Sequence, residues 1–139
     1  MYVYGLVFLS SVFCLFFSQR VPSKFLSKAL IIMSVIIPAL LAGMRAVEVG
    51  TDTLAYKTVY FNPIKHISSF QELIVWTIEQ EFEIGFVFWN YIIAKIFGNY
   101  QWFLFFSELF ILCFVYKTLF LLKTKIDLNF GLLSYYLFF

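Results

Sequence analysis

The chain alternates between apolar runs and shorter polar connections. The runs cover residues 1–17, 25–44, 82–97, 100–122 and 131–139. Runs of this kind predict membrane helices, because a helix of about 20 residues crosses the hydrocarbon core of a bilayer. The first run, 17 residues long, reaches roughly 25 Å as a helix, which is near the lower limit. The last run stops after nine residues, so we expect an incomplete chain from a larger polytopic protein.

The fold class that this pattern predicts is all-α, a polytopic integral membrane protein. We expect about four to five transmembrane or re-entrant helices and one interfacial amphipathic helix, in a single transmembrane domain over residues 1–139. The longest polar segment, residues 45–81, is predicted to be a loop on the outer side of the membrane.

Two short helices are predicted within this loop. Asp52 or Thr53 is a suitable cap for a helix through Tyr60, which Asn62-Pro63 would end. Ser69 and Glu72 form a capping-box pattern, and apolar residues then recur at helical spacing. These residues predict an amphipathic helix over 70–80 that lies along the membrane surface. Its acidic face argues against binding to anionic lipid.

The basic residues predict a topology but leave one step open. Arg20, Lys24 and Lys28 in the first connection indicate that it is cytoplasmic, with the N-terminus and residues 45–81 outside. If residues 82–97 cross the membrane fully, Lys123 and Lys125 lie outside, against the bias for basic residues inside. If this run dips in and returns, the bias is restored. The sequence does not choose between these topologies.

Composition and charge narrow the class further. The chain is 63% hydrophobic and 23% aromatic, with a mean hydropathy of +0.90, more apolar surface than one soluble core of this size buries. A net charge of +2 with scattered bases gives no nucleic-acid surface. Cys14 and Cys113 lack paired spacing, and zinc and nucleotide-binding motifs are missing from the sequence. We therefore expect no cofactor and no bound metal.

The polar stretch from Gly43 to Tyr56 concentrates charge that the rest of the chain avoids. Arg45 there is either an interface anchor paired with Glu48 or an anion clamp, because a guanidinium forms two parallel hydrogen bonds with phosphate oxygens. Asp52 is either a helix cap or a base that accepts a proton from a sugar hydroxyl, with Thr51 and Thr53 as further hydrogen-bonding groups.

Two carboxylates lie in the later apolar runs. Glu83 opens the third run, where it is functional if it lies below the lipid head groups and an ordinary helix-start acid if it lies at the surface. At 100° per residue, Glu83 shares a stripe with Asn90, which indicates a face toward protein or water. Glu108 lies near the middle of the fourth run, where it either binds substrate or contacts a neighbouring helix.

The ordered motifs together resemble the N-terminal part of the EpsG-like family of polysaccharide-biosynthesis membrane proteins, related in role to Wzy-type O-antigen polymerases. The span that ends in Gly-x-Arg, the Val-Gly-Thr-Asp-Thr-x-x-x-Tyr stretch and the Glu-x-Gly-Phe motif carry the resemblance. Its residues are Gly43, Arg45, Gly50, Thr51, Asp52, Tyr56, Glu83, Gly85 and Phe86. Ile84 stands where the family commonly has proline between the Glu and Gly of the second motif.

The resemblance implies a polymerase at the outer face of a bacterial inner membrane, which joins lipid-linked repeats of O-antigen, capsule or exopolysaccharide. Its substrate would be an undecaprenyl-pyrophosphate-linked oligosaccharide, and other glycan-assembly membrane proteins are possible partners. Arg45 would stabilise the departing pyrophosphate, and Asp52 or Glu83 would accept the proton. Thr51, Thr53, Tyr56 and Glu108 would contact substrate. The alternatives are a flippase for lipid-linked sugars and a non-catalytic subunit of a glycan-assembly complex.

Overall fold

The computed structural model describes residues 2–46 and 51–138, with only the backbone of residues 51 and 52. The described residues form helices and contain no strand, which confirms the all-α prediction. The chain divides into two compact units. Unit 1 comprises Met1–Gly43 and Phe105–Phe139, and unit 2 comprises Met44–Leu104.

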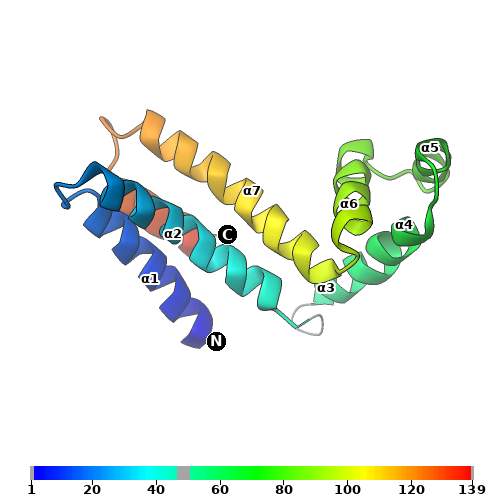
Figure 1. Cartoon of the computed structure of the whole chain (residues 1–139), viewed down its shortest axis with the longest axis horizontal. Coiled ribbons are helices and arrows are strands. Elements are labelled where there is room, and N and C mark those ends of the chain that lie inside the picture. Colours follow the sequence, from blue (N-terminus) through cyan, green and yellow to red (C-terminus); the bar gives the residue numbers. More distant parts are fainter. Residues whose placement is uncertain (1, 47–50, 139) are drawn as a thin grey trace. The chain divides into compact units, whose positions relative to one another are not determined.

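A helix occupies each of the five apolar runs (Figure 1). These helices are α1 (Tyr2–Ser18), α2 (Lys24–Met44), α6 (Ile84–Phe97), α7 (Tyr100–Leu121) and α8 (Leu128–Phe138). Among the described residues, α2 and α7 are long and apolar enough to cross a membrane, while α1, α6 and α8 are shorter apolar helices. The number of crossings and the single-domain assignment stay predictions.

A buried polar network joins the four helices of unit 1. The Ser11 hydroxyl donates to the Ser34 carbonyl oxygen and lies 2.9 Å from the Tyr136 hydroxyl. The Tyr116 hydroxyl donates to the Ser34 hydroxyl over 2.8 Å. Because lipid offers no hydrogen bonds, side-chain bonds of this kind hold helices together in a bilayer.

An apolar cluster continues the same interface of unit 1. Leu15 packs with Leu119, Leu128 and other buried side chains. At Gly131 in α8, an added Cβ would collide with the Leu119 side chain of α7. The absence of a side chain at residue 131 therefore leaves room for the end of the Leu119 side chain.

Unit 2 contains one continuous helical segment with a π-helical turn. Its parts are α3 (Thr51–Tyr56), the π-helix η1 (Lys57–Phe61) and α4 (Asn62–His66). The prediction that Asn62-Pro63 ends this helix is wrong. Proline lacks an N–H and its ring clashes with the carbonyl four residues earlier. The Asn62 N–H instead donates to the Lys57 carbonyl oxygen, and this wider turn lets the helix continue.

The amphipathic helix is α5 (Phe70–Glu79), as the capping-box pattern predicts. The Ser69 hydroxyl accepts from the Glu72 N–H over 3.2 Å, and the Glu72 carboxylate accepts from the Ser68 N–H over 2.9 Å. In the usual capping box this carboxylate accepts from the N–H of the N-cap residue. Here it accepts from the N–H of Ser68, the residue before the N-cap. The position of α5 along a membrane surface stays a prediction.

Candidate functional site

The turn between α5 and α6 brings an acidic residue into an unusual backbone conformation. Glu81 has a φ of 55°, which places it in the left-handed region that favours glycine. The Glu81 N–H donates to the Ile78 carbonyl oxygen and the Phe82 N–H to the Thr77 carbonyl oxygen. These two bonds define a Schellman motif, in which glycine normally holds the position of Glu81.

A carboxylate is unfavourable at this position for two reasons. A left-handed conformation costs a non-glycine residue roughly 1–2 kcal/mol. The C-terminal end of a helix also carries partial negative charge, which repels a carboxylate. Backbone strain of this kind concentrates at functional sites, so the carboxylate of Glu81 is a candidate functional group.

Glu81 and Glu83 line the same pocket of about 290 Å³, together with Tyr56, Tyr60, Phe82 and Phe86. We call these six residues the carboxylate pocket. Its size is near the lower end of the roughly 300–1,000 Å³ that is typical of small-molecule sites. The described lining contains two carboxylates and two phenols, and no lysine or arginine.

Aromatic contacts fix the wall of the carboxylate pocket. Measured between ring centroids, Tyr60 lies 4.4 Å from Phe82 and 5.2 Å from Phe86. The rings of Tyr60 and Phe86 are perpendicular. The Tyr56 ring lies 5.6 Å from the Tyr60 ring and 5.8 Å from the Phe86 ring. The edge-to-face pair of Tyr60 and Phe86 contributes about 0.5–1.5 kcal/mol beyond area burial. The π-helical turn thus presents Tyr60 to the start of α6.

Glu83 lies at the N-cap of α6, and its side chain is exposed. In the described part of unit 2 this side chain makes no capping hydrogen bond. The stripe predicted for α6 is buried where Val87, Asn90 and Ala94 lie, which confirms that this face packs against protein. Asn90 is only 1% exposed and donates to the Phe86 carbonyl oxygen over 2.9 Å. Glu83 therefore stands at the exposed end of a buried stripe.

Arg45 belongs to the same unit as the carboxylate pocket, and its side chain is half-buried. Both Arg45 and Tyr56 interact electrostatically with Tyr100, the first residue of α7. The Tyr100 ring lies 5.5 Å from the Phe103 ring, which in turn lies 5.8 Å from the Phe86 ring. A short aromatic series thus connects the surroundings of Arg45 with the wall of the pocket.

The other predicted site residues have different locations. Asp52 and Thr53 both lie inside α3, which begins at Thr51, and Thr53 is buried there. Neither residue is therefore the N-cap, and both cap predictions are wrong. Thr51 begins α3 and Asp52 follows it, but their side chains and the partner predicted for Arg45, Glu48, lie outside the described residues. Glu108 belongs to unit 1, where it is half-buried and interacts electrostatically with Tyr135 and Tyr136.

Sequence reasoning missed Glu81, Tyr60 and Phe82 as members of the site. The spacing of four residues between Tyr56 and Tyr60 was a visible sign that both lie on one helix face. The left-handed conformation of Glu81 had no comparable sign, because the position after the C-cap of α5 is occupied by glutamate and not by the glycine that would mark the turn.

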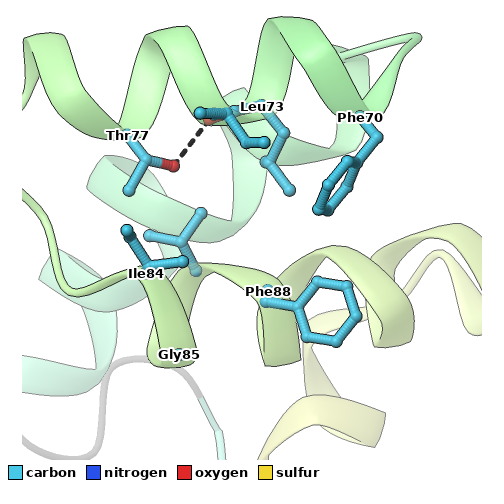
Figure 2. A pocket seen from close by; sticks show the side chains of 8 residues that line it. Phe70, Leu73, Thr77, Ile84, Gly85 and Phe88 are labelled. Carbon is cyan, nitrogen blue, oxygen red and sulfur yellow. Dashed lines mark hydrogen bonds between the residues drawn. The ribbon is translucent and has the colours of Figure 1, made fainter.

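An apolar groove lies on the other side of the first turn of α6 (Figure 2). Phe70, Leu73 and Thr77 of α5 face Ile84 and Phe88 of α6 across it. The Thr77 hydroxyl donates to the Leu73 carbonyl oxygen over 2.6 Å, so its polar group is satisfied within α5. The groove has a volume of about 230 Å³ and offers an almost entirely apolar lining.

The helices and their surfaces define the class first. Large apolar side chains are exposed along both long helices, as in a helical membrane protein and unlike the buried core helix of a soluble one. The EpsG family model matches residues 28–139, and the chain belongs to the EpsG family. This membership identifies a membrane protein of polysaccharide biosynthesis. Comparison with curated proteins gave no match, and neither did comparison with solved structures.

Proposed function

We propose that the chain forms part of a membrane polymerase that joins lipid-linked oligosaccharide repeats of a surface polysaccharide. The observation that carries this proposal is the carboxylate pocket, where Glu81 and Glu83 lie beside the rings of two tyrosines and two phenylalanines. Family membership supports the pathway. The proposed location is the bacterial inner membrane, and the proposed substrate is an oligosaccharide on undecaprenyl pyrophosphate.

The proposed reaction needs no nucleotide, because the bond between sugar and pyrophosphate is already activated. The acceptor hydroxyl oxygen attacks the anomeric carbon of the donor, and the bond from that carbon to the pyrophosphate oxygen breaks. The hydroxyl proton passes to a carboxylate, and the lipid pyrophosphate leaves with the electron pair. The protein therefore has to supply a base and a cation.

We assign the acceptor sugar to the carboxylate pocket. Two carboxylates accept hydrogen bonds from sugar hydroxyls, and their negative charge disfavours the pyrophosphate of the donor in the same place. Glu83 is the candidate base, because its carboxylate is exposed at the pocket and makes no cap bond within the described structure. Glu81 is the candidate group that orients the acceptor.

We assign the donor pyrophosphate to Arg45. A guanidinium stabilises the charge that develops on the leaving phosphate oxygens. The aromatic series from Tyr100 through Phe103 to Phe86 supports placing Arg45 and the pocket in one site. Asp52 stays a second candidate base.

We propose that the apolar groove binds the isoprenoid chain of a substrate. Ile84 and Gly85 line the groove, while their neighbours Glu83 and Phe86 line the carboxylate pocket. One turn of α6 thus separates an apolar surface from a polar one, as the two parts of a lipid-linked sugar require. In this assignment α5 guides the substrate at the membrane interface.

Glu83→Gln in the full-length protein tests the base assignment. Glu79→Gln is the matched control, since Glu79 is exposed at the end of α5 and does not line the pocket. Loss of a general base lowers the rate by roughly 10²–10⁴-fold. We expect Glu83→Gln to abolish the long-chain glycan ladder at normal membrane level of the protein, and Glu79→Gln to preserve it. An unchanged ladder in Glu83→Gln would refute the assignment.

A further inference from the structure

The charges of the chain are unevenly divided between the two units. Unit 1 has six lysines and arginines and two acids, whereas unit 2 has four and six. The basic residues of unit 1 lie in its two polar connections or in the helical turns next to them. They are Arg20, Lys24, Lys28, Lys117, Lys123 and Lys125, all with exposed side chains. Unit 1 therefore has a concentrated positive charge.

The two connections of unit 1 lie at the same end of it. The Gln19 side chain, after α1, donates to the Asn129 side chain, at the start of α8, over 3.2 Å. Leu15 near the end of α1 packs with Leu119 near the end of α7 and with Leu128. Figure 1 shows the α1–α2 connection and the orange α7–α8 connection at one end of the unit. The six basic residues thus form one basic end.

The two acids of unit 1 offset only a small part of this charge. Asp127 caps α8, and its carboxylate oxygen accepts from the N–H groups of Asn129 and Phe130 over 2.9 Å each. Glu108 lies nine residues before Lys117, roughly 13 Å nearer the start of α7 at 1.5 Å per residue. The basic end therefore keeps a net positive charge.

The chain leaves unit 1 and returns to it at the opposite end. Tyr116 of α7 bonds to Ser34 of α2, which sets these two helices at a common depth. From Ser34 the chain runs away from the basic end to Gly43, and Phe105 precedes Tyr116 by a similar length. These stretches of nine and eleven residues correspond to about 13 and 16 Å of helix.

We propose that the basic end of unit 1 binds the anionic lipid head groups of the cytoplasmic leaflet. Lysine and arginine concentrate in cytoplasmic connections, and each one near an anionic surface adds to the attraction. If α2 and α7 are the two long spans, the end of α2 at Met44 and the start of α7 at Tyr100 are then extracytoplasmic. The chain therefore leaves unit 1 at Gly43 and returns to it at Phe105 on that outer side. This inference rests on unit 1 and not on the proposed function.

The sequence leaves open whether residues 82–97 cross the membrane, and the proposed topology answers this question. Helix α6 has 14 residues, which give roughly 21 Å, less than the hydrocarbon core of about 30 Å. It therefore enters the membrane without crossing it, or lies outside it, and the third apolar run is not a span. The carboxylate pocket, whose residues all belong to unit 2, is then outside.

Cysteine labelling tests this topology. The background is the full-length protein with Cys14→Ser and Cys113→Ser, which removes the two free thiols of residues 1–139, and with any other cysteine likewise replaced by serine. Single variants Ser23→Cys, Thr124→Cys and Ser68→Cys place reporters in the α1–α2 connection, the α7–α8 connection and the exposed connection before α5. A membrane-impermeant maleimide is applied to intact protoplasts and to permeabilised ones.

We expect labelling of Ser23→Cys and Thr124→Cys only after permeabilisation, and labelling of Ser68→Cys in intact protoplasts. Labelling of Thr124→Cys, but not Ser23→Cys, from outside would refute the common basic end. Labelling of both with protection of Ser68→Cys would refute the orientation. A normal membrane level of each variant shows that the chain is inserted, and none of these results depends on polymerase activity.

Discussion

The centroid of the Tyr60 ring lies 4.4 Å from the centroid of the Phe82 ring. This contact joins the π-helical turn before Pro63 to the turn between α5 and α6. It places the two carboxylates that flank Phe82, those of Glu81 and Glu83, in one pocket with Tyr56. The local backbone irregularities of unit 2 therefore meet at the candidate site.

Glu81→Gly separates the stability of this turn from its function. Glycine relieves the left-handed conformation, so we expect an unfolding free energy higher by roughly 1 kcal/mol and a higher apparent melting temperature in detergent. The carboxylate is lost, so polymer chains should shorten. Glu81→Ala is the control that loses the carboxylate and keeps the strain. A stabilised Glu81→Gly protein with normal polymer would mean that the carboxylate has no role.

Arg45→Ala tests the assignment of the pyrophosphate. Removal of a group that stabilises transition-state charge costs roughly 10²–10³ in rate, so we expect single repeats at the cell surface and no long-chain ladder. Lys65→Ala is the control, because Lys65 is an exposed cation of α4 that does not line the carboxylate pocket. Loss of all surface glycan in Arg45→Ala would indicate a flippase, and an unchanged ladder would make Arg45 an interface anchor.

The polar network of unit 1 predicts coupling between Ser34 and Tyr116. Ser34→Ala removes the hydroxyl that accepts from the buried Tyr116 hydroxyl and leaves Ser11 as the other partner of Tyr116. This loss should cost roughly 0.6–1.7 kcal/mol in a membrane protein. The double variant with Tyr116→Phe should recover much of this loss, because both polar groups are then absent. Unfolding of the single and double variants in detergent measures the coupling. Additive effects would show that the bond contributes nothing.

Gly131→Val tests the packing of α8 against Leu119 of α7. The new side chain would collide with Leu119, and overpacking of this kind typically costs about 1–3 kcal/mol. Gly5→Val is the matched control, because Gly5 is a helical glycine with open space around its position. We expect a lower melting temperature for Gly131→Val than for Gly5→Val, and equal values would contradict the packing.

The helices were largely predictable from the sequence, and the site was only partly so. Long apolar runs specify helices wherever lipid is the solvent, because every backbone group has to be satisfied internally. The capping pattern at Ser69 and Glu72 likewise predicted the start of α5. Both signals depend only on residues that are close together in the sequence, so they can be read without knowing the fold.

The failures arose where one local rule overrode another. Proline at residue 63 usually ends a helix, but the π-helical turn gives the Asn62 N–H a different partner. Glu81 adopts a left-handed backbone conformation that glutamate disfavours, so its residue type gave no reason to predict the turn there. Tyr56 and Glu83 were both named from the sequence, yet their common pocket depends on packing between segments distant in the chain.

Reconstitution of the purified full-length protein with lipid-linked repeats tests the central claim most directly. Proteoliposomes would contain this substrate alone, without nucleotide, and the length of the lipid-linked glycan would be measured over time. We predict that the wild-type protein lengthens the glycan and that Glu83→Gln, at equal protein content, does not. Movement of the substrate across the bilayer without any new glycosidic bond would contradict the account.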